Sequence, residues 1–209
     1  FNLMEERDVQ IKGYRVHLPL DLVIVASANP EDYTSRGRII TPLKDRYAAQ
    51  VRTHYPATRE LELGVVLQEA KLPAVDGVTL HVPRFMQEVV AELTLQARKS
   101  ADVNQGSGVS VRMSIANYET LAANALRRAL ALGEREAVPR VTDLEALVTG
   151  TSGKLELEYE GELKGADQIG RELIRAAVST VFDGRFPDAD TRGIVEWFDL
   201  GGSLNLGDL

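Results

Sequence analysis

The sequence predicts an α/β segment, then an all-α region, then a small tail that combines a strand with a helix. Residues 22–26 (LVIVA) form a β-branched run without alternation, which is typical of a strand buried on both faces of a parallel sheet. From residue 57 onward the apolar residues recur every three or four positions, as they do on amphipathic helices. Near residue 155 they alternate with glutamates, which predicts a half-exposed strand.

Composition excludes several classes of function. The chain has 209 residues, 44% of them hydrophobic, and its 24 basic and 31 acidic residues give a net charge of −7. We do not expect so acidic a chain to bind nucleic acid or an anionic membrane, and we expect it in the cytoplasm. It has no cysteine and only three scattered histidines, so no metal site or disulfide is predicted. The longest apolar run, residues 22–26, is too short to cross a bilayer.

The N-terminal segment is expected to be mainly β-structure. Residues 8–18 alternate polar and apolar around a Lys-Gly pair at 12–13, which predicts a β-hairpin. The buried strand follows and leads into residues 27–30 (SANP). Residues 41–42 (TP) then provide an N-cap and a first helical position. The other elements expected before Pro56 are a polar loop over 31–40, a short helix over 43–46 and a strand over 49–54.

Helices dominate the remainder of the chain. The spacing of apolar residues predicts helices over 57–68, 83–99 and 111–132, and the tail is expected to hold a strand over 155–160 and a helix over 166–182. Residues 150–154 (GTSGK) invite comparison with a phosphate loop. The pattern G-x-x-x-x-G-K-[ST] fails, however, because Val148 and Leu155 stand where Gly and Ser or Thr belong. We therefore expect an ordinary loop there.

Three residues are candidates for chemistry, and each also has an ordinary structural interpretation. Asn29 follows the predicted buried strand, at the sheet edge where ligands of α/β proteins gather, although Asn before Pro is commonly a turn residue. Arg46 follows Asp45 on the short helix and could simply be a surface charge. Arg112 lies in the first turn of a predicted helix, where the helix dipole disfavours a cation. A bound phosphate would resolve that conflict, and a solvated arginine is the alternative.

These candidates occur in an order that resembles a known family. The similarity rests on the segments 5–7 (EER), 23–30 (VIVASANP), 36–38 (RGR) and 42–47 (PLKDRY), together with the hairpin. They resemble AAA+ ATPases of the magnesium chelatase ATPase-subunit and MoxR group. The resemblance is dense over residues 1–56 and thinner through the helices to about residue 148.

The resemblance implies a role for each candidate residue. Asn29 corresponds to sensor 1, the Asn that follows the strand in this family. Arg46 corresponds to the arginine finger, because it stands in a Leu-x-Asp-Arg-aromatic segment. Arg112 corresponds to sensor 2, an Arg that opens a lid helix, and the hairpin resembles the insertion before sensor 1.

The family's phosphate loop and acidic magnesium-binding strand lie upstream, and neither occurs in this sequence. The resemblance therefore implies the second half of an AAA+ module: a partial α/β core over 1–56, a helical lid over 57–149 and a C-terminal extension over 150–209. ATP and Mg²⁺ would require the upstream half. The chain alone is expected to lack ATPase activity and tight ATP binding.

The activity implied for a full-length parent is ATP hydrolysis that drives remodelling of a partner or metal insertion. An arginine finger acting in trans implies a homo-oligomeric ring, expected to be a hexamer, with a client or co-subunit protein. A metal-chelatase motor and a MoxR-type chaperone both fit. Enhancer-binding activators fit less well, because they carry Phe-Arg-x-Asp-Leu where this chain has residues 42–45 (PLKD). A non-catalytic helical module that binds proteins is the alternative from another class.

Overall fold

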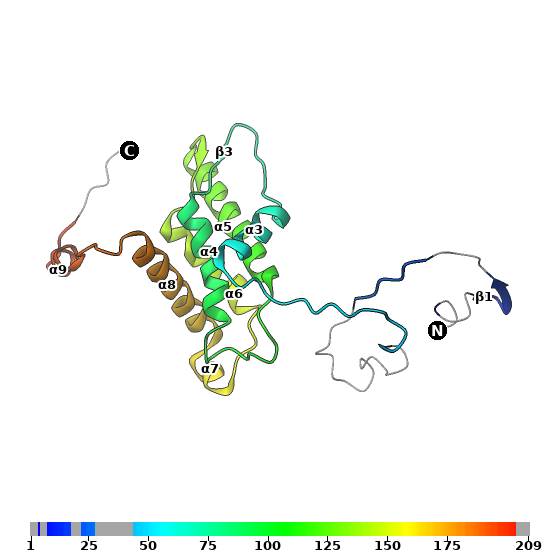
Figure 1. The fold of residues 1–209 in the computed structure, drawn as a ribbon. Helices are drawn as coiled ribbons and strands as arrows, with labels where there is room; N and C mark the ends of the chain where they lie inside the picture. The colour runs from blue at the N-terminus through cyan, green and yellow to red at the C-terminus, as the bar shows by residue number, and fades with distance from the viewer. Residues whose placement is uncertain (1–3, 5–7, 18–21, 28–43, 204–209) are drawn as a thin grey trace. The chain divides into compact units, whose positions relative to one another are not determined.

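A computed structural model describes residue 4 and residues 8–17, 22–27 and 44–203. The chain divides into two compact units, residues 1–54 and 55–209, each considered by itself. The first unit contains a β-hairpin, and the second consists mainly of helices (Figure 1). In the described part of the chain, no helix combines the length and apolar character that a membrane span needs.

The predicted hairpin in the first unit is confirmed. Strand β1 (Asp8–Ile11) pairs antiparallel with β2 (Tyr14–His17), with Ile11 opposite Tyr14. The two turn residues between them, Lys12 and Gly13, have φ angles of 50° and 85°. A two-residue turn with two positive φ angles has the same twist as the strands that it joins. The Lys-Gly pair therefore fixes which residues of β1 and β2 lie opposite each other.

The other β-strands predicted for this unit are not formed. Residues 22–27 have no regular secondary structure and Val23 is 92% exposed, so the prediction of a buried strand over 22–26 is wrong for this chain. A central strand needs neighbours for its backbone hydrogen bonds, and no described strand pairs with this segment. The strand predicted over 49–54 is absent for the same reason. Of the helix predicted over 43–46, residue 43 lies outside the described residues, and Lys44 begins a single turn.

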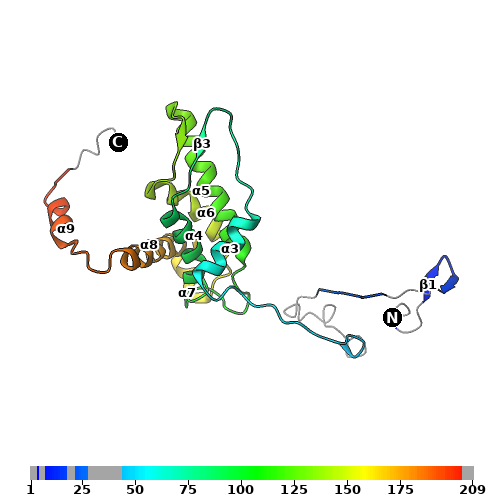
Figure 2. The same ribbon diagram turned by 45° about the horizontal axis from the view of Figure 1, so that its top comes forward.

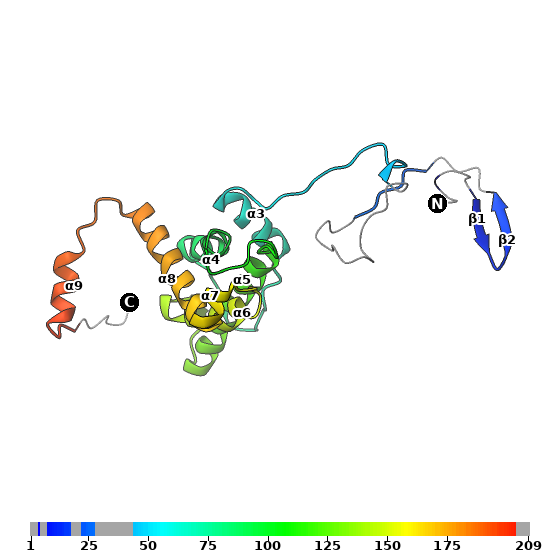
Figure 3. The same ribbon diagram turned by 90° about the horizontal axis from the view of Figure 1, so that it is seen from below.

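The four longest helices of the second unit were all predicted, three of them from apolar spacing. They are α3 (Arg59–Glu69), α4 (Arg84–Ala97), α5 (Val111–Leu132) and α8 (Ala166–Arg185). Helix α4 packs against the other three, as the view along the bundle shows (Figure 3). Helix α5 begins after the N-cap Ser110 and ends at Gly133, whose φ of 70° suits a glycine C-cap.

Short elements complete this unit. After α3 the chain runs through a loop to β3 (Thr79–Leu80), which pairs in parallel with β4 (Glu136–Ala137) (Figure 2). The remaining elements are the 3₁₀-helix η1 (Val141–Ala146), α6 (Leu147–Ser152), α7 (Tyr159–Lys164) and α9 (Arg192–Asp199).

Two predictions for the tail need correction. The strand predicted over 155–160 is reduced to a single bridge between Leu157 and Val103, and α7 starts at Tyr159. Glu160 and Glu162 lie in the first turn of α7, where acidic side chains stabilise a helix. The loop predicted over 150–154 is in part helical, because α6 extends to Ser152.

One hydrophobic core joins the helices of the second unit. Its fully buried side chains come from α3, α4, α5, α6 and α8, among them Leu63, Met86, Leu121, Leu147 and Ile169. Helix α8, which falls in the C-terminal extension implied by the resemblance, thus shares this core with α4. The family-based division of the chain stays a prediction.

Gly161 provides a test of this packing. A Cβ atom there would overlap the carbonyl oxygen of Asp102, so Gly161→Ala should lower the free energy of unfolding by about 1–3 kcal/mol through overpacking. Gly64 in α3 has open space around it, so the control Gly64→Ala should instead stabilise the protein by about 0.5–1 kcal/mol. Urea unfolding followed by circular dichroism measures both. Equal effects of the two substitutions would contradict the described packing of α7.

Candidate functional site

The structure places two of the three predicted site residues. Asn29 lies outside the described residues. Arg46 is half-buried in the first unit, within the single turn between Lys44 and Tyr47. Arg112 is exposed in the first turn of α5 in the second unit. The helical start predicted for Arg112 is therefore confirmed, and it provides the best-defined candidate site.

The N-terminus of α5 combines a cation with backbone N–H groups. Ser110 caps the helix, and its hydroxyl accepts a hydrogen bond of 3.2 Å from the Arg112 backbone N–H. The first turn contains no acidic residue. Within the described part of the chain, the Arg112 guanidinium makes no hydrogen bond or ion pair. Its positive charge thus adds to that of the helix dipole, and both favour an anion.

Helix α3, unlike α5, has acidic side chains in its first turn, where they are usual. Its first turn carries Glu60 and Glu62, and Thr58 is its N-cap. A hydrogen bond from its own backbone N–H, with a smaller contribution from Thr58, lowers the pKa of Glu60. Arginine also begins α3, α4 and α9, but each of those arginines is in an ion pair: Arg59 with Glu92, Arg84 with Glu88 and Arg192 with Asp190. Arg112 differs because it lacks such a partner among the described residues.

Arg98, the residue that follows α4, holds the chain that leads into α5. Its Nε donates to the backbone carbonyl of Val109 at 2.9 Å, one residue before the cap. Its two terminal nitrogens donate to the Glu62 carboxylate at 2.8 and 3.2 Å. The planar guanidinium thus connects α3 to the entry of α5 through a two-pronged ion pair.

Tyr55 covers the other side of the same guanidinium. The central carbon of Arg98 lies 4.5 Å from the centre of the Tyr55 ring, which is a cation–π contact. Gly108 has a φ of +69°, and a Cβ atom there would overlap the Tyr55 hydroxyl. The loop before α5 therefore requires glycine at this position for two independent reasons.

The Glu62 carboxylate is fully buried, and its hydrogen bonds extend into α5. Ser114 donates to it over 2.6 Å and also shares a hydrogen bond with the buried Thr94 hydroxyl. A buried charge is tolerated only where partners of this kind satisfy it. Glu62, Thr94, Arg98 and Ser114, which we call the anchor network, thus fix the N-terminal end of α5 relative to α3 and α4.

A second buried carboxylate fixes the other end of α5. Asp143 in η1 accepts hydrogen bonds from Asn124 at 2.8 Å, from Arg128 at 3.1 Å and from the Arg140 backbone N–H at 2.7 Å. Asn124 and Arg128 both belong to α5. Because α5 is held near both of its ends, its exposed first turn is a rigid platform.

Asn117, in the middle of α5, holds residues 150–151 of α6 against α5. Its side-chain nitrogen donates to the buried Thr151 hydroxyl at 3.0 Å. A Cβ atom on Gly150 would lie only 3.1 Å from the Asn117 oxygen, so glycine permits this close approach. The Gly-Thr pair that resembled part of a phosphate loop thus has a packing role.

The anchor network was not predicted from the sequence. Glu62 lies next to Leu63 and four residues before Val66, on the side of α3 that faces the core. A carboxylate on the apolar side of an amphipathic helix is the signal that could have identified it. Its partner Arg98 is 36 residues away, and nothing in the sequence connects the two.

The chemistry available at this site is anion binding. The Arg112 guanidinium and the positive end of the α5 dipole both suit a phosphate or carboxylate. Among the residues that the structure describes, no three His, Cys, Asp or Glu side chains gather in a way that could hold a metal ion. Comparison with family models, with curated proteins and with solved structures gives no match to this chain.

The anchor network leads to a prediction about stability. Glu62→Ala leaves the Arg98 guanidinium largely buried without its carboxylate, so we expect the free energy of unfolding to fall by about 3–5 kcal/mol. The control Glu145→Ala removes an exposed partner of Arg171 and should cost less than about 1 kcal/mol. Denaturant unfolding of both variants gives the comparison. A similar small loss in both would show that the buried pair does not hold the fold.

Proposed function

We propose that this chain is the C-terminal part of an AAA+ ATPase of the magnesium chelatase and MoxR group, with a helical lid over residues 57–149 and a C-terminal extension over 150–209. The observation that carries this proposal is the exposed Arg112 in the first turn of α5, with no acidic partner among the described residues. Such a cation on an anchored helix suits sensor 2, which contacts a nucleotide phosphate. The family resemblance around residues 23–47 supports the assignment.

The other two residues receive roles by the same proposal. Asn29 would act as sensor 1 and orient the attacking water at the terminal phosphate of ATP. Arg46 would act as the arginine finger toward the nucleotide of a neighbouring subunit in a homo-oligomeric ring. Positive charge from such residues stabilises the transition state of phosphoryl transfer.

The described residues do not supply every part of an ATPase. They contain no cluster of carboxylates for Mg²⁺, so we assign the metal and most ATP contacts to a phosphate-loop half of the full-length protein. Residues 57–149 would add a lid that responds to the nucleotide. A phosphate that binds Arg112 better in the closed state than in the open state draws the lid toward the core.

Two uses of the ATPase remain open within this proposal. A metal-chelatase motor would drive insertion of a metal ion by a partner subunit, and a MoxR-type chaperone would remodel a client protein. Both share the residues described above. The partner in either case is a client or co-subunit protein, and we place both in the cytoplasm.

A non-catalytic helical module that binds other proteins is the second candidate. It is favoured by the exposed apolar side chains Leu61 and Leu67 of α3. The role of Arg112 distinguishes the two functions, because only the ATPase requires Arg112 to sense nucleotide.

Arg112 should control closure of the lid in the full-length protein. We expect Arg112→Ala to remove most of the ATP-dependent compaction measured by FRET between the lid and the α/β core. ATP affinity should fall about tenfold to a hundredfold, because a hydrogen bond to a charged group contributes about 1.5–3 kcal/mol. Arg127→Ala is the matched control, since Arg127 is an exposed arginine of the same helix about 22 Å farther along its axis.

The comparison between these two variants decides the assignment of Arg112. Compaction that is the same in wild type and both variants would contradict a role in sensing nucleotide. Equal loss in both would show a general effect of charge on α5 instead of a contact at its N-terminus.

Arg46 should act on a neighbouring subunit. Arg46→Ala and Arg46→Lys should both lower ATP turnover by about 10³-fold and leave ATP binding intact, because a finger needs the planar guanidinium as well as the charge. Subunits that lack Arg46 should regain activity when mixed with subunits whose phosphate loop is disabled. Mixed rings that form but stay inactive would exclude action in trans.

A further inference from the structure

Helix α9 is amphipathic and has no buried residue. Ile194, Val195, Trp197 and Phe198 lie on one side of it, and each is between 43 and 58% exposed. Charged residues occupy the other side. Four large apolar side chains on one short helix indicate a surface that another part of the protein covers.

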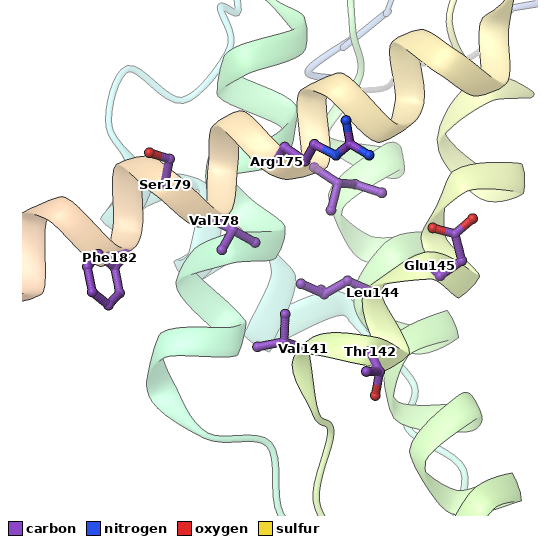
Figure 4. A pocket seen from close by; sticks show the side chains of 9 residues that line it. Val141, Thr142, Leu144, Glu145, Arg175, Val178, Ser179 and Phe182 are labelled. Atoms are coloured by element: carbon purple, nitrogen blue, oxygen red, sulfur yellow. The ribbon is translucent and has the colours of Figure 1, made fainter. Parts of the chain in front are cut away.

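A groove that is also mainly apolar lies between η1 and α8. It has a volume of about 430 Å³ and is lined mainly by apolar side chains. Figure 4 shows Val141 and Leu144 of η1 facing Val178 of α8, with Phe182 one turn farther along. Val141 and Phe182 are both exposed, so the end of the groove toward the C-terminus of α8 is open to solvent.

The dimensions of the groove match those of α9. The α8 residues that line it run from Ile174 to Phe182, which is about 12 Å of helix, and the eight residues of α9 span about 12 Å as well. Six residues, 186–191, connect the two helices. Connections of this length commonly join antiparallel helices. We propose that α9 docks antiparallel to α8 in the groove of its own chain and completes a helical hairpin.

Charge supports the antiparallel direction. Arg175 lies at the rim of the groove and has no ion-pair partner among the described residues. Asp199 is the last residue of α9 and, within the same set of residues, is likewise not in an ion pair. The antiparallel arrangement brings Asp199 to the level of Arg175, at the end of the groove away from Phe182. The parallel arrangement would place it at the opposite end.

The small size of α9 favours its own chain over a second copy. With about half of each side chain exposed and about 200 Å² for a large one, its apolar side covers roughly 400 Å². A stable interface between two chains buries about 800 Å² on each partner. A short connection instead supplies an effective concentration in the millimolar range, so a small contact is sufficient within one chain.

Trp197 allows a direct test because it is the only tryptophan of the chain. In the wild-type chain of residues 1–209 its emission should be shifted to shorter wavelength and protected from acrylamide. Phe182→Asp and Val141→Asp place charges in the groove at exposed positions, so the fold should survive, as circular dichroism checks. Both should shift the emission to that of tryptophan in water. The control Leu163→Asp, on the exposed surface of α7, should leave the emission unchanged.

A charge exchange tests the orientation of the helix. Arg175→Glu and Asp199→Arg should each increase acrylamide quenching of Trp197, and the double variant should restore the wild-type level. Emission typical of exposed tryptophan in the wild type, or unchanged by Phe182→Asp, would overturn docking in this groove. Protection that disappears on hundredfold dilution would also overturn the proposal, because the occupant would then be α9 of a second copy.

Discussion

The ion pair between Glu62 and Arg98 holds together the part of the protein on which the proposed function depends. Glu62 is fully buried, and its carboxylate is satisfied by the Arg98 guanidinium and the Ser114 hydroxyl. These contacts connect α3, the end of α4 and the first turns of α5. Burying two charges costs desolvation energy. This geometry offsets that cost because each of the three guanidinium nitrogens of Arg98 donates a hydrogen bond. The ion pair therefore contributes more to the position of α5 than to net stability.

Fixing α5 has a direct consequence for chemistry. Arg98 holds the carbonyl of Val109, Ser110 caps the helix, and Asp143 holds the opposite end through Arg128. The first turn is thereby presented to solvent with Arg112 on it, in a position that its own dipole disfavours. An exposed cation without an ion-pair partner, on a helix end that several contacts hold in place, suits an anion. This is the physical reason for proposing that Arg112 acts as sensor 2.

The sequence predicted those elements whose formation depends on residues close together in the chain. The spacing of apolar residues predicted α5, and the Lys-Gly pair predicted the hairpin, because helical periodicity and tight turns depend on residues close together in the sequence. The buried strand at 22–26 was predicted wrongly, because an apolar run shows that a segment favours burial without showing that its partners are present. The pair Glu62–Arg98 could not be predicted, since it joins residues that only the packing of α3 on α4 brings together. The same limit applies to the groove at η1 and α8, which depends on two distant segments.

The central claim is that these helices serve an ATPase whose phosphate-binding half precedes them. Sequencing the native gene upstream of the codon for Phe1 tests this claim most directly. We predict, within about 150 residues or one domain upstream, the pattern G-x-x-x-x-G-K-[ST] between a strand and a helix, followed by a strand that ends in acidic residues. A reading frame that begins without this pattern would contradict the claim and would leave a helical module that binds other proteins.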